Sequence, residues 1–300
     1  MDTERIAAIL KVLEAGSLSA AAEQLGYTVS GLSRQISSLE QETGLVLLHR
    51  EHRGVSPTPA CRELLGPMRQ MLAAEEHYRQ RAAALMGMEL GTLRIGCAYD
   101  SYFPYLSAMV AQFSSAHPNI RVEIFEGSSS EMSTAVREGR ADFAVISRRE
   151  GEFDWIPLCK DALMAVLPLR HSLCHEKEYP VARFETDDFI EILPQRETDN
   201  SRMFKSLGLR PRTRFTCNDS LAALSMVEAG LGVTLVNALI LENWRGKAAI
   251  LPLDPPHQVE IGIAILSCAE ASPASTSFLE LLPTPDKTDM RLALGKYREM

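Results

Sequence analysis

The chain has 300 residues, 46% of them hydrophobic, and a formal net charge of −8 at pH 7. This length predicts two or three compact domains, and the acidic balance excludes a protein that coats nucleic acid by bulk positive charge. No apolar run reaches the ~18 residues of a membrane span, and the first residues lack a signal-peptide core, so a cytoplasmic protein is expected.

Six cysteines are scattered along the chain without a CxxC pair. This spacing argues against a disulfide framework and against a structural zinc site. The stretch HSLCH at 171–175 has loosely ligand-like spacing, but a loop with incidental His and Cys is the favoured interpretation, and no metal site is predicted. A redox-active thiol stays open.

The N-terminal region predicts three short helices. Residues 3–15 have apolar positions along one helical face, Gly16 ends that helix, and Ser17 can cap the next. A run of alanines would let this second helix approach another backbone closely. Thr28 is a candidate N-cap for a third helix that runs to about Thr43.

The third predicted helix has two different faces. Leu32, Ile36 and Leu39 follow i, i+4, i+7 spacing and should face the core. The remaining surface is rich in short polar side chains, Ser30, Ser33, Ser37 and Ser38, and also includes Arg34. Two helices joined by a short turn, the second with such a face, are typical of a DNA-binding helix-turn-helix. A merely solvated face would more often have Lys and Glu, which are better helix formers.

A basic turn and a long helix follow. The segment VLLHREHRGVSPTPA places Arg50 and Arg53 around Gly54, which suits either a β-hairpin wing that touches DNA or a basic surface loop. Thr58 and Pro59 then predict the start of a helix to about residue 86. Its surplus of apolar residues indicates a packing partner, and a second copy of the chain is the obvious candidate.

Beyond residue 91, short apolar runs alternate with helical patterns. This alternation predicts an α/β unit with parallel strands, divided into two lobes with a ligand cleft beyond the strand ends. The predicted strands are TLRIGCA, RVEIFEG, DFAVIS, LMAVLP, FIEIL, GVTLV and VEIGIAIL.

Several strings resemble the LysR-type transcriptional regulators. In residues 1–60 they are GSLSAAAEQLGYT, SGLSRQISSLEQETGL, LLHR and RGVSPTPA. In residues 92–285 the looser cues TLRIG, DFAVIS, LMAVLP and DSLAALSMVEAGLGVTLV resemble the effector-binding domain of that family, a fold shared with periplasmic binding proteins.

The resemblance implies an architecture and a set of partners. The fold is α/β with an N-terminal all-α winged helix-turn-helix (1–58), a linker and dimerisation helix (59–90), a two-lobed periplasmic-binding-protein-like effector domain (91–285) and a tail (286–300) without an assigned role. The implied partners are double-stranded DNA at partly palindromic promoter sites, a small-molecule effector, and the chain itself as a homodimer or dimer of dimers. RNA polymerase is a further candidate.

DNA contacts are assigned around the third helix. Thr28 and Ser30 should bind phosphate near its N-terminus, where backbone amides favour anions. Ser33 and Arg34 are the candidate base-reading pair, and Arg50 with the second wing arginine should add phosphate contacts.

Position 29 departs from the family pattern, which usually has glutamine there. Glutamine can grip adenine through two hydrogen bonds, whereas Val29 offers an apolar contact suited to a thymine methyl. The alternative is that Val29 packs inward beside Leu32. Leu48 and Cys61, where the family has phenylalanine and glycine, are interpreted as packing changes.

The expected effector pocket lies between the lobes. Serine hydroxyls that precede helices could hold a carboxylate, with Arg148 or Arg196 as countercharge, and Tyr99, Tyr102 and Phe103 suit a flat ligand. The effector is therefore expected to be anionic or aromatic, although N-capping and ordinary packing explain the same residues. The candidate lining residues are Tyr99, Ser101, Ser128, Ser129, Ser147, Arg196, Asn218 and Thr234.

An enzyme is the main rival class. The sequence lacks GxSxG, a P-loop, HExxH and a GxGxxG fingerprint after a strand, so no catalytic residues and no cofactor are predicted. The second alternative is a cytoplasmic ligand-binding protein of periplasmic-binding-protein fold without promoter-specific DNA binding. Neither rival accounts for residues 17–40.

Overall fold

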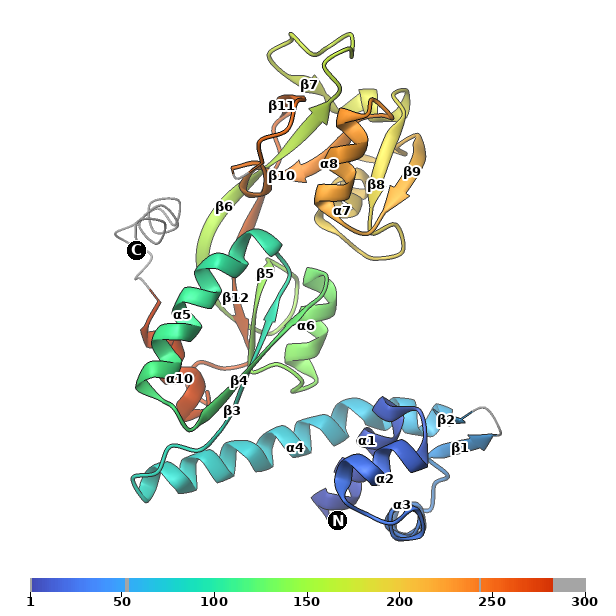
Figure 1. Ribbon diagram of the computed structural model, residues 1–300, viewed down its shortest axis with the longest axis vertical. Helices are drawn as coiled ribbons and strands as arrows, with labels where there is room; N and C mark the ends of the chain where they lie inside the picture. The colour runs from blue at the N-terminus through green and yellow to red at the C-terminus, as the bar shows by residue number, and fades with distance from the viewer. Residues whose placement is uncertain (1, 52–53, 243, 283–300) are drawn as a thin grey trace.

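The computed structural model describes residues 2–51, 54–242 and 244–282. Arg53 and the tail predicted at 286–300 lie outside these ranges. Figure 1 shows the described chain as a helical N-terminal domain, a long helix beneath a central lobe, and a second lobe at the far end.

The N-terminal domain is the three-helix unit that the sequence predicts. Its helices are α1 (Thr3–Ala15), α2 (Leu18–Leu25) and α3 (Val29–Thr43). The Ser17 hydroxyl accepts a hydrogen bond from the Ala20 amide, and the Thr28 hydroxyl accepts one from the Gly31 amide, so both predicted caps are present. Leu32, together with the other predicted core residues of α3, is fully buried against α1 and α2.

The basic turn forms a wing. Strands β1 (Leu48–Glu51) and β2 (Gly54–Pro57) pair antiparallel, so the hairpin alternative is the one found. Glu40 of α3 anchors its base, because one carboxylate oxygen accepts from the amides of Leu47 and Leu48 at 2.8 and 3.3 Å. Leu48 is buried, as is Cys61, in agreement with their interpretation as packing residues.

Helix α4 (Pro59–Leu85) begins at the predicted cap and runs beneath the central lobe (Figure 1). Arg69 pairs with Glu138 at 2.6 Å, and the Gln70 amide donates to a carbonyl of the same lobe. Near the C-terminal end of the helix, buried Gln80 donates to the Thr92 carbonyl at 3.2 Å. The helix is therefore fastened to the lobe at its middle and near its C-terminal end.

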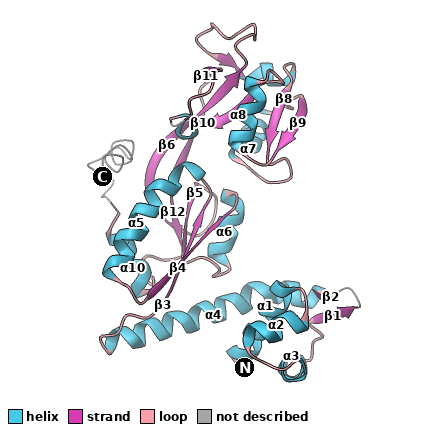
Figure 2. Cartoon of the chain, viewed as in Figure 1, coloured by secondary structure: helices cyan, strands magenta, loops and turns pink. Residues whose placement is uncertain are grey.

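The central lobe, lobe 1, has a mixed sheet in the order β4-β3-β5-β12-β6. Strands β3, β4 and β5 are parallel, whereas β12 runs antiparallel to β5 and β6. Helices α5 and α10 cover one face and α6 the other (Figure 2). The elements are β3 (Gly91–Cys97), η1 (Asp100–Tyr102), α5 (Phe103–Ala116), β4 (Ile120–Glu126), α6 (Ser129–Arg137), β5 (Phe143–Ser147), β6 (Asp154–Leu167), β12 (Gln258–Ile265) and α10 (Pro273–Glu280).

Lobe 2 continues from the second half of β6, which pairs with β10 and β11. Strand β8 pairs with β9, and its Phe189 forms an isolated bridge with Val233, the residue before β10. The elements are β7 (Tyr179–Pro180), η2 (Val181–Glu185), β8 (Phe189–Ile192), α7 (Asp199–Leu207), β9 (Thr213–Cys217), α8 (Ser220–Glu228), β10 (Thr234–Asn237), α9 (Ala238–Leu241) and β11 (Ala249–Asp254).

The sheets differ in two ways from the expected parallel arrangement. Strand β6 spans both lobes, and the chain returns through β12, so these two strands run in opposite directions and make the sheets mixed. Strands β7, β9 and β11 were not predicted. The two-lobed α/β division itself is confirmed. Among the described helices, none combines the length and apolar character needed to cross a membrane.

Candidate DNA-binding face and effector cleft

The N-terminal turn of α3 is exposed. Thr28, Val29 and Ser30 are all open to solvent, and 46% of Val29 is accessible. The inward packing of Val29 beside Leu32 is therefore wrong: the two side chains lie on different faces, since Leu32 is fully buried. Arg34 is likewise exposed. This surface combines hydroxyls, one cation and one apolar group.

The wing is connected to this face. An Arg50 guanidinium nitrogen donates to the Ser33 hydroxyl at 2.8 Å, and a second nitrogen lies 4.0 Å from a Glu40 carboxylate oxygen. The two predicted DNA-contacting residues thus lie together even without DNA. Since the second wing arginine lies outside the described residues, Arg50 is the wing cation whose position is known.

A cavity of about 400 Å³ lies between the lobes. Five of the eight predicted effector-site residues line it: Tyr99, Ser128, Ser129, Arg196 and Asn218. Ile192, Leu235 and Ile240 give it an apolar wall on the lobe 2 side. Most of the predicted effector residues therefore lie in this cleft.

Three of the predicted effector residues do not line this cavity: Thr234, Ser101 and Ser147. Thr234 is fully buried, and its hydroxyl donates to the Ile190 carbonyl at 2.9 Å, so it joins β10 to β8 instead of lining the cavity. Ser101 lies in η1 outside the cavity lining, and its buried hydroxyl has no partner among the described residues. Tyr102 and Phe103 pack in the core of lobe 1, which leaves Tyr99 as the cavity aromatic.

The predicted serines mostly form hydrogen bonds within the protein. Ser128 caps α6 and shares a capping box with Glu131. The Ser129 hydroxyl accepts from the Ser147 amide at 3.0 Å and lies 3.1 Å from the Ser147 hydroxyl. Ser147 is thus positioned behind the cavity instead of lining it.

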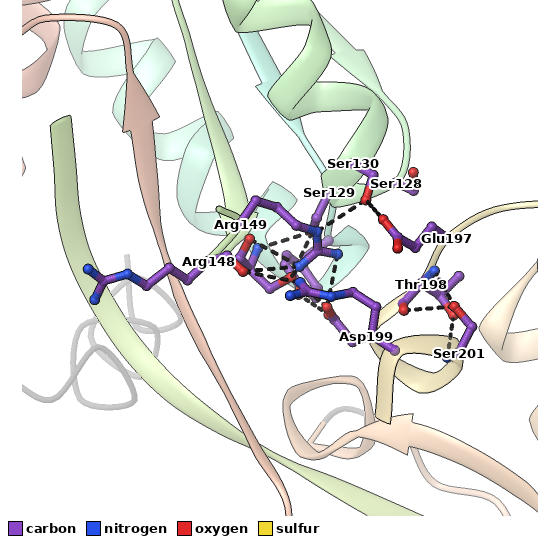
Figure 3. Close-up of polar contacts among 12 residues, drawn as sticks. Ser128, Ser129, Ser130, Arg148, Arg149, Glu197, Thr198, Asp199 and Ser201 are labelled. Atoms are coloured by element: carbon purple, nitrogen blue, oxygen red, sulfur yellow. Dashed lines mark hydrogen bonds and ion pairs between the residues drawn. The ribbon is translucent and has the colours of Figure 1, made fainter. Parts of the chain in front are cut away.

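The centre of the cleft is Asp199, which the sequence analysis did not single out. It is the first residue of α7 in lobe 2, yet its carboxylate reaches lobe 1 (Figure 3). There it accepts a hydrogen bond from the Ser147 hydroxyl at 2.5 Å, one from the Tyr99 hydroxyl, and pairs with Arg149 at 3.1 Å. Side-chain exposure is 10% for Asp199 and 7% for Arg149.

Arg149 provides the buried countercharge, not Arg148 or Arg196. Arg148 extends away from the cavity, pairing with Glu260 at 3.3 Å beneath the face of Trp155. A sequence signal existed: beyond β5, side chains in extended backbone alternate, so Ser147 and Arg149 should share a direction opposite to Arg148. Arg149 also donates to the Ser147 hydroxyl.

Other polar contacts join the lobes around this centre. Ser130 of lobe 1 accepts from Arg149 at 3.1 Å and donates to Glu197 of lobe 2 at 2.7 Å (Figure 3). Arg196 pairs with Glu131 at 3.1 Å, both side chains being nearly half exposed. These contacts connect the two lobes in the observed arrangement.

Burial and charge set the protonation of the cleft. Burial first, and then the Asp199 carboxylate, raise the pKa of Tyr99 well above its ordinary value, so this hydroxyl stays a donor. Burial and the neighbouring Asp219 raise the pKa of Asp100. The hydrogen bond from Ser130 lowers the pKa of Glu197. Within the described ranges, no group of three or more His, Cys, Asp or Glu side chains could hold a metal ion.

A winged helix-turn-helix joined through a long helix to a two-lobed ligand-binding domain defines a DNA-binding transcriptional regulator that responds to a small molecule. The sequence matches the bacterial regulatory helix-turn-helix proteins of the lysR family over residues 3–62, and the LysR substrate binding domain over residues 87–284. The chain belongs to the LysR family of transcriptional regulators.

Similar proteins match most of the chain's length. The HTH-type transcriptional regulator BenM of Acinetobacter baylyi is 27% identical over 91% of this chain and 92% of that protein. The transcriptional dual regulator GltC of Bacillus subtilis is 25% identical over 94% and 96%. Full-length CbnR in complex with its target DNA shares the fold, with a TM-score of 0.61 at 20% identity, covering 93% of this chain and 98% of that one.

Proposed function

We propose that α3 enters the major groove of promoter DNA while the β1–β2 wing lies on the flanking backbone. The observation that carries this proposal is the exposed N-terminal turn of α3, where Val29 stands among hydroxyls instead of packing inward. A free apolar side chain at the tip of such a helix suits a thymine methyl.

The residues divide by the part of DNA that they suit. Thr28 and Ser30 lie at the positive end of the α3 dipole and suit phosphate. Ser33 and Arg34 lie farther along the same helix and suit base edges. Arg50 already touches Ser33, so it suits the phosphate beside the base that Ser33 meets.

In the cleft, we propose that the effector occupies the cavity lined by Tyr99, Ser128, Ser129, Arg196 and Asn218. Two connections join the lobes, β6 and the return to β12. A ligand that contacts both lobes can therefore change the angle between them by its differential affinity for the open and closed forms. That change is proposed to alter how assembled copies present their α3 helices to DNA.

We also propose that the chain self-associates through α4 and acts in the cytoplasm. Tyr78 and Leu85 of α4 are largely exposed, which supports pairing with a second copy. The family membership and the similar regulators support a cytoplasmic DNA-binding role without catalysis. RNA polymerase is the proposed further partner at the promoter.

Selection from a random duplex pool tests the DNA-binding proposal. The full-length protein should enrich a two-fold-symmetric site, and fluorescence anisotropy with salt titration should then give its affinity. Arg34→Ala should weaken binding by about 1–3 kcal/mol if Arg34 reads a base. Arg121→Ala, an exposed arginine of lobe 1, is the matched control and should change nothing. Absence of enrichment at low salt would refute promoter-specific binding.

A second selection tests the role of position 29. Val29→Gln should sharpen the base preference at one symmetric position, because glutamine can grip adenine through two hydrogen bonds whereas valine offers only an apolar contact with the thymine methyl. The α3 core should be unaffected because Val29 is exposed. An unchanged selected site would show that Val29 does not contact a base.

A further inference from the structure

The cleft already contains a carboxylate paired with its buried arginine. Asp199 of lobe 2 accepts hydrogen bonds from the Tyr99 and Ser147 hydroxyls and pairs with Arg149. With only a tenth of its side chain exposed, it occupies the place that a ligand carboxylate would need. An anionic ligand would have to displace this internal partner.

The remaining charge of the cavity is negative. Its second arginine, Arg196, is engaged by Glu131 at 3.1 Å. Three further carboxylates line the same cavity, and within the described part of the chain none of them forms an ion pair: Asp100, Glu126 and Asp219. Asp100 and Asp219 belong to different lobes and lie close enough for Asp219 to raise the pKa of Asp100. A positive charge between them would relieve this repulsion.

A buried side-chain amide in the cavity gives a second, independent indication of what the ligand contains. Asn237 ends β10, lines the same cavity and is only 8% exposed, yet its Nδ2 has no hydrogen-bond partner among the described residues. Leaving a buried donor unpaired is costly. The apolar wall of Ile192, Leu235 and Ile240 lies in the same cavity. The complementary molecule has an apolar body and an acceptor atom.

We infer that the cleft binds a cationic small molecule, an ammonium or amidinium compound with an apolar body. Asp199 of lobe 2 then stays paired with Arg149 of lobe 1. This inference rests on the proposed effector role of the cavity. The cation lies between Asp100 and Asp219, and so contacts one acid from each lobe.

Two probes of similar shape and opposite charge test it. Benzamidinium and benzoate, each with a 4-methoxy group whose oxygen can accept from the Asn237 amide, are titrated into the full-length protein by isothermal calorimetry at low ionic strength. Benzamidinium should bind at least about tenfold more tightly than benzoate. The double variant Asp100→Asn/Asp219→Asn should weaken benzamidinium about fivefold, since asparagine still caps α8 at position 219. Glu178→Gln, an exposed acid outside the cavity lining, is the control and should have no effect.

The variant Asp199→Ala supplies the reverse experiment. It vacates the position beside Arg149 and Ser147, so benzoate should gain at least about fivefold in affinity. Benzoate binding to the wild type as tightly as benzamidinium would overturn the cationic class and leave the cavity as the effector site. Binding of neither probe at about 10 mM, by wild type or Asp199→Ala, would overturn the effector site as well.

Discussion

Replacing Asp199 by alanine is expected to destabilise the effector domain by about 3 kcal/mol, because it leaves Arg149 buried without its ion-pair partner. Breaking a buried pair in this way typically costs about 3–5 kcal/mol. The lower end applies here, since Arg149 keeps the carbonyls of Ser147 and Arg148, each at 3.3 Å. For a domain of this size, the transition midpoint should fall by about 6–12 °C.

The measurement is a double-mutant cycle in thermal and urea unfolding, followed by circular dichroism and tryptophan fluorescence. Arg149→Met alone should also destabilise, whereas Asp199→Ala combined with Arg149→Met should cost less than the sum, with a coupling of about 2 kcal/mol. Arg196→Met breaks the exposed pair with Glu131 and should cost under about 1 kcal/mol. Equal small effects at both pairs, with no coupling, would refute the role given to Asp199.

Three further outcomes are expected. Arg50→Ala should weaken DNA binding for all sequences and reduce the salt-dependence slope by about one; an unchanged slope would remove Arg50 from the phosphate contacts. Because burial and Asp219 raise the pKa of Asp100, the stability that Asp100 contributes is complete below its ordinary pKa and is lost as pH rises through the raised one. Asp219→Asn should lower that pKa in a carbon-13 NMR titration, and a constant value would exclude electrostatic coupling. Burial raises the pKa of Cys97 to about 12, so a disulfide reagent at pH 8 should modify it only after denaturation; native labelling at the rate of a free thiol would contradict this.

Local patterns predicted the helices well because their causes are local. The apolar spacing of Leu32, Ile36 and Leu39, with the Thr28 cap, is sufficient to fix where α3 starts and which face it buries. Strand β11 was missed because Pro252 lies in its middle, and proline removes a ladder donor. The strand still forms because Pro252 pairs only with β6. Pairing with β7, on the other side of β11, begins at Leu253.

The cleft could be predicted only in part. Ser128 and Ser129 were found because they follow a strand at the sheet edge, where such folds bind ligands. The role of Asp199 could not be predicted, since an acidic residue in the first turn of a helix is explained by the helix alone. Its role arises when lobe 2 meets lobe 1, and that meeting depends on long-range packing of two separate cores.

The attachment of α4 to lobe 1 limits which part of the molecule can move relative to the N-terminal domain. The contacts from Arg69 and Gln80 join the helix to the lobe at its middle and near its C-terminal end, and Met68 of the same helix packs in the core of the N-terminal domain. The N-terminal domain, the linker helix and lobe 1 are therefore connected by direct contacts, and we expect lobe 2 to move relative to them when a ligand binds. Such a movement would leave α3 of the same chain in place. We therefore expect the signal to reach DNA through a contact between lobe 2 and a neighbouring copy of the chain.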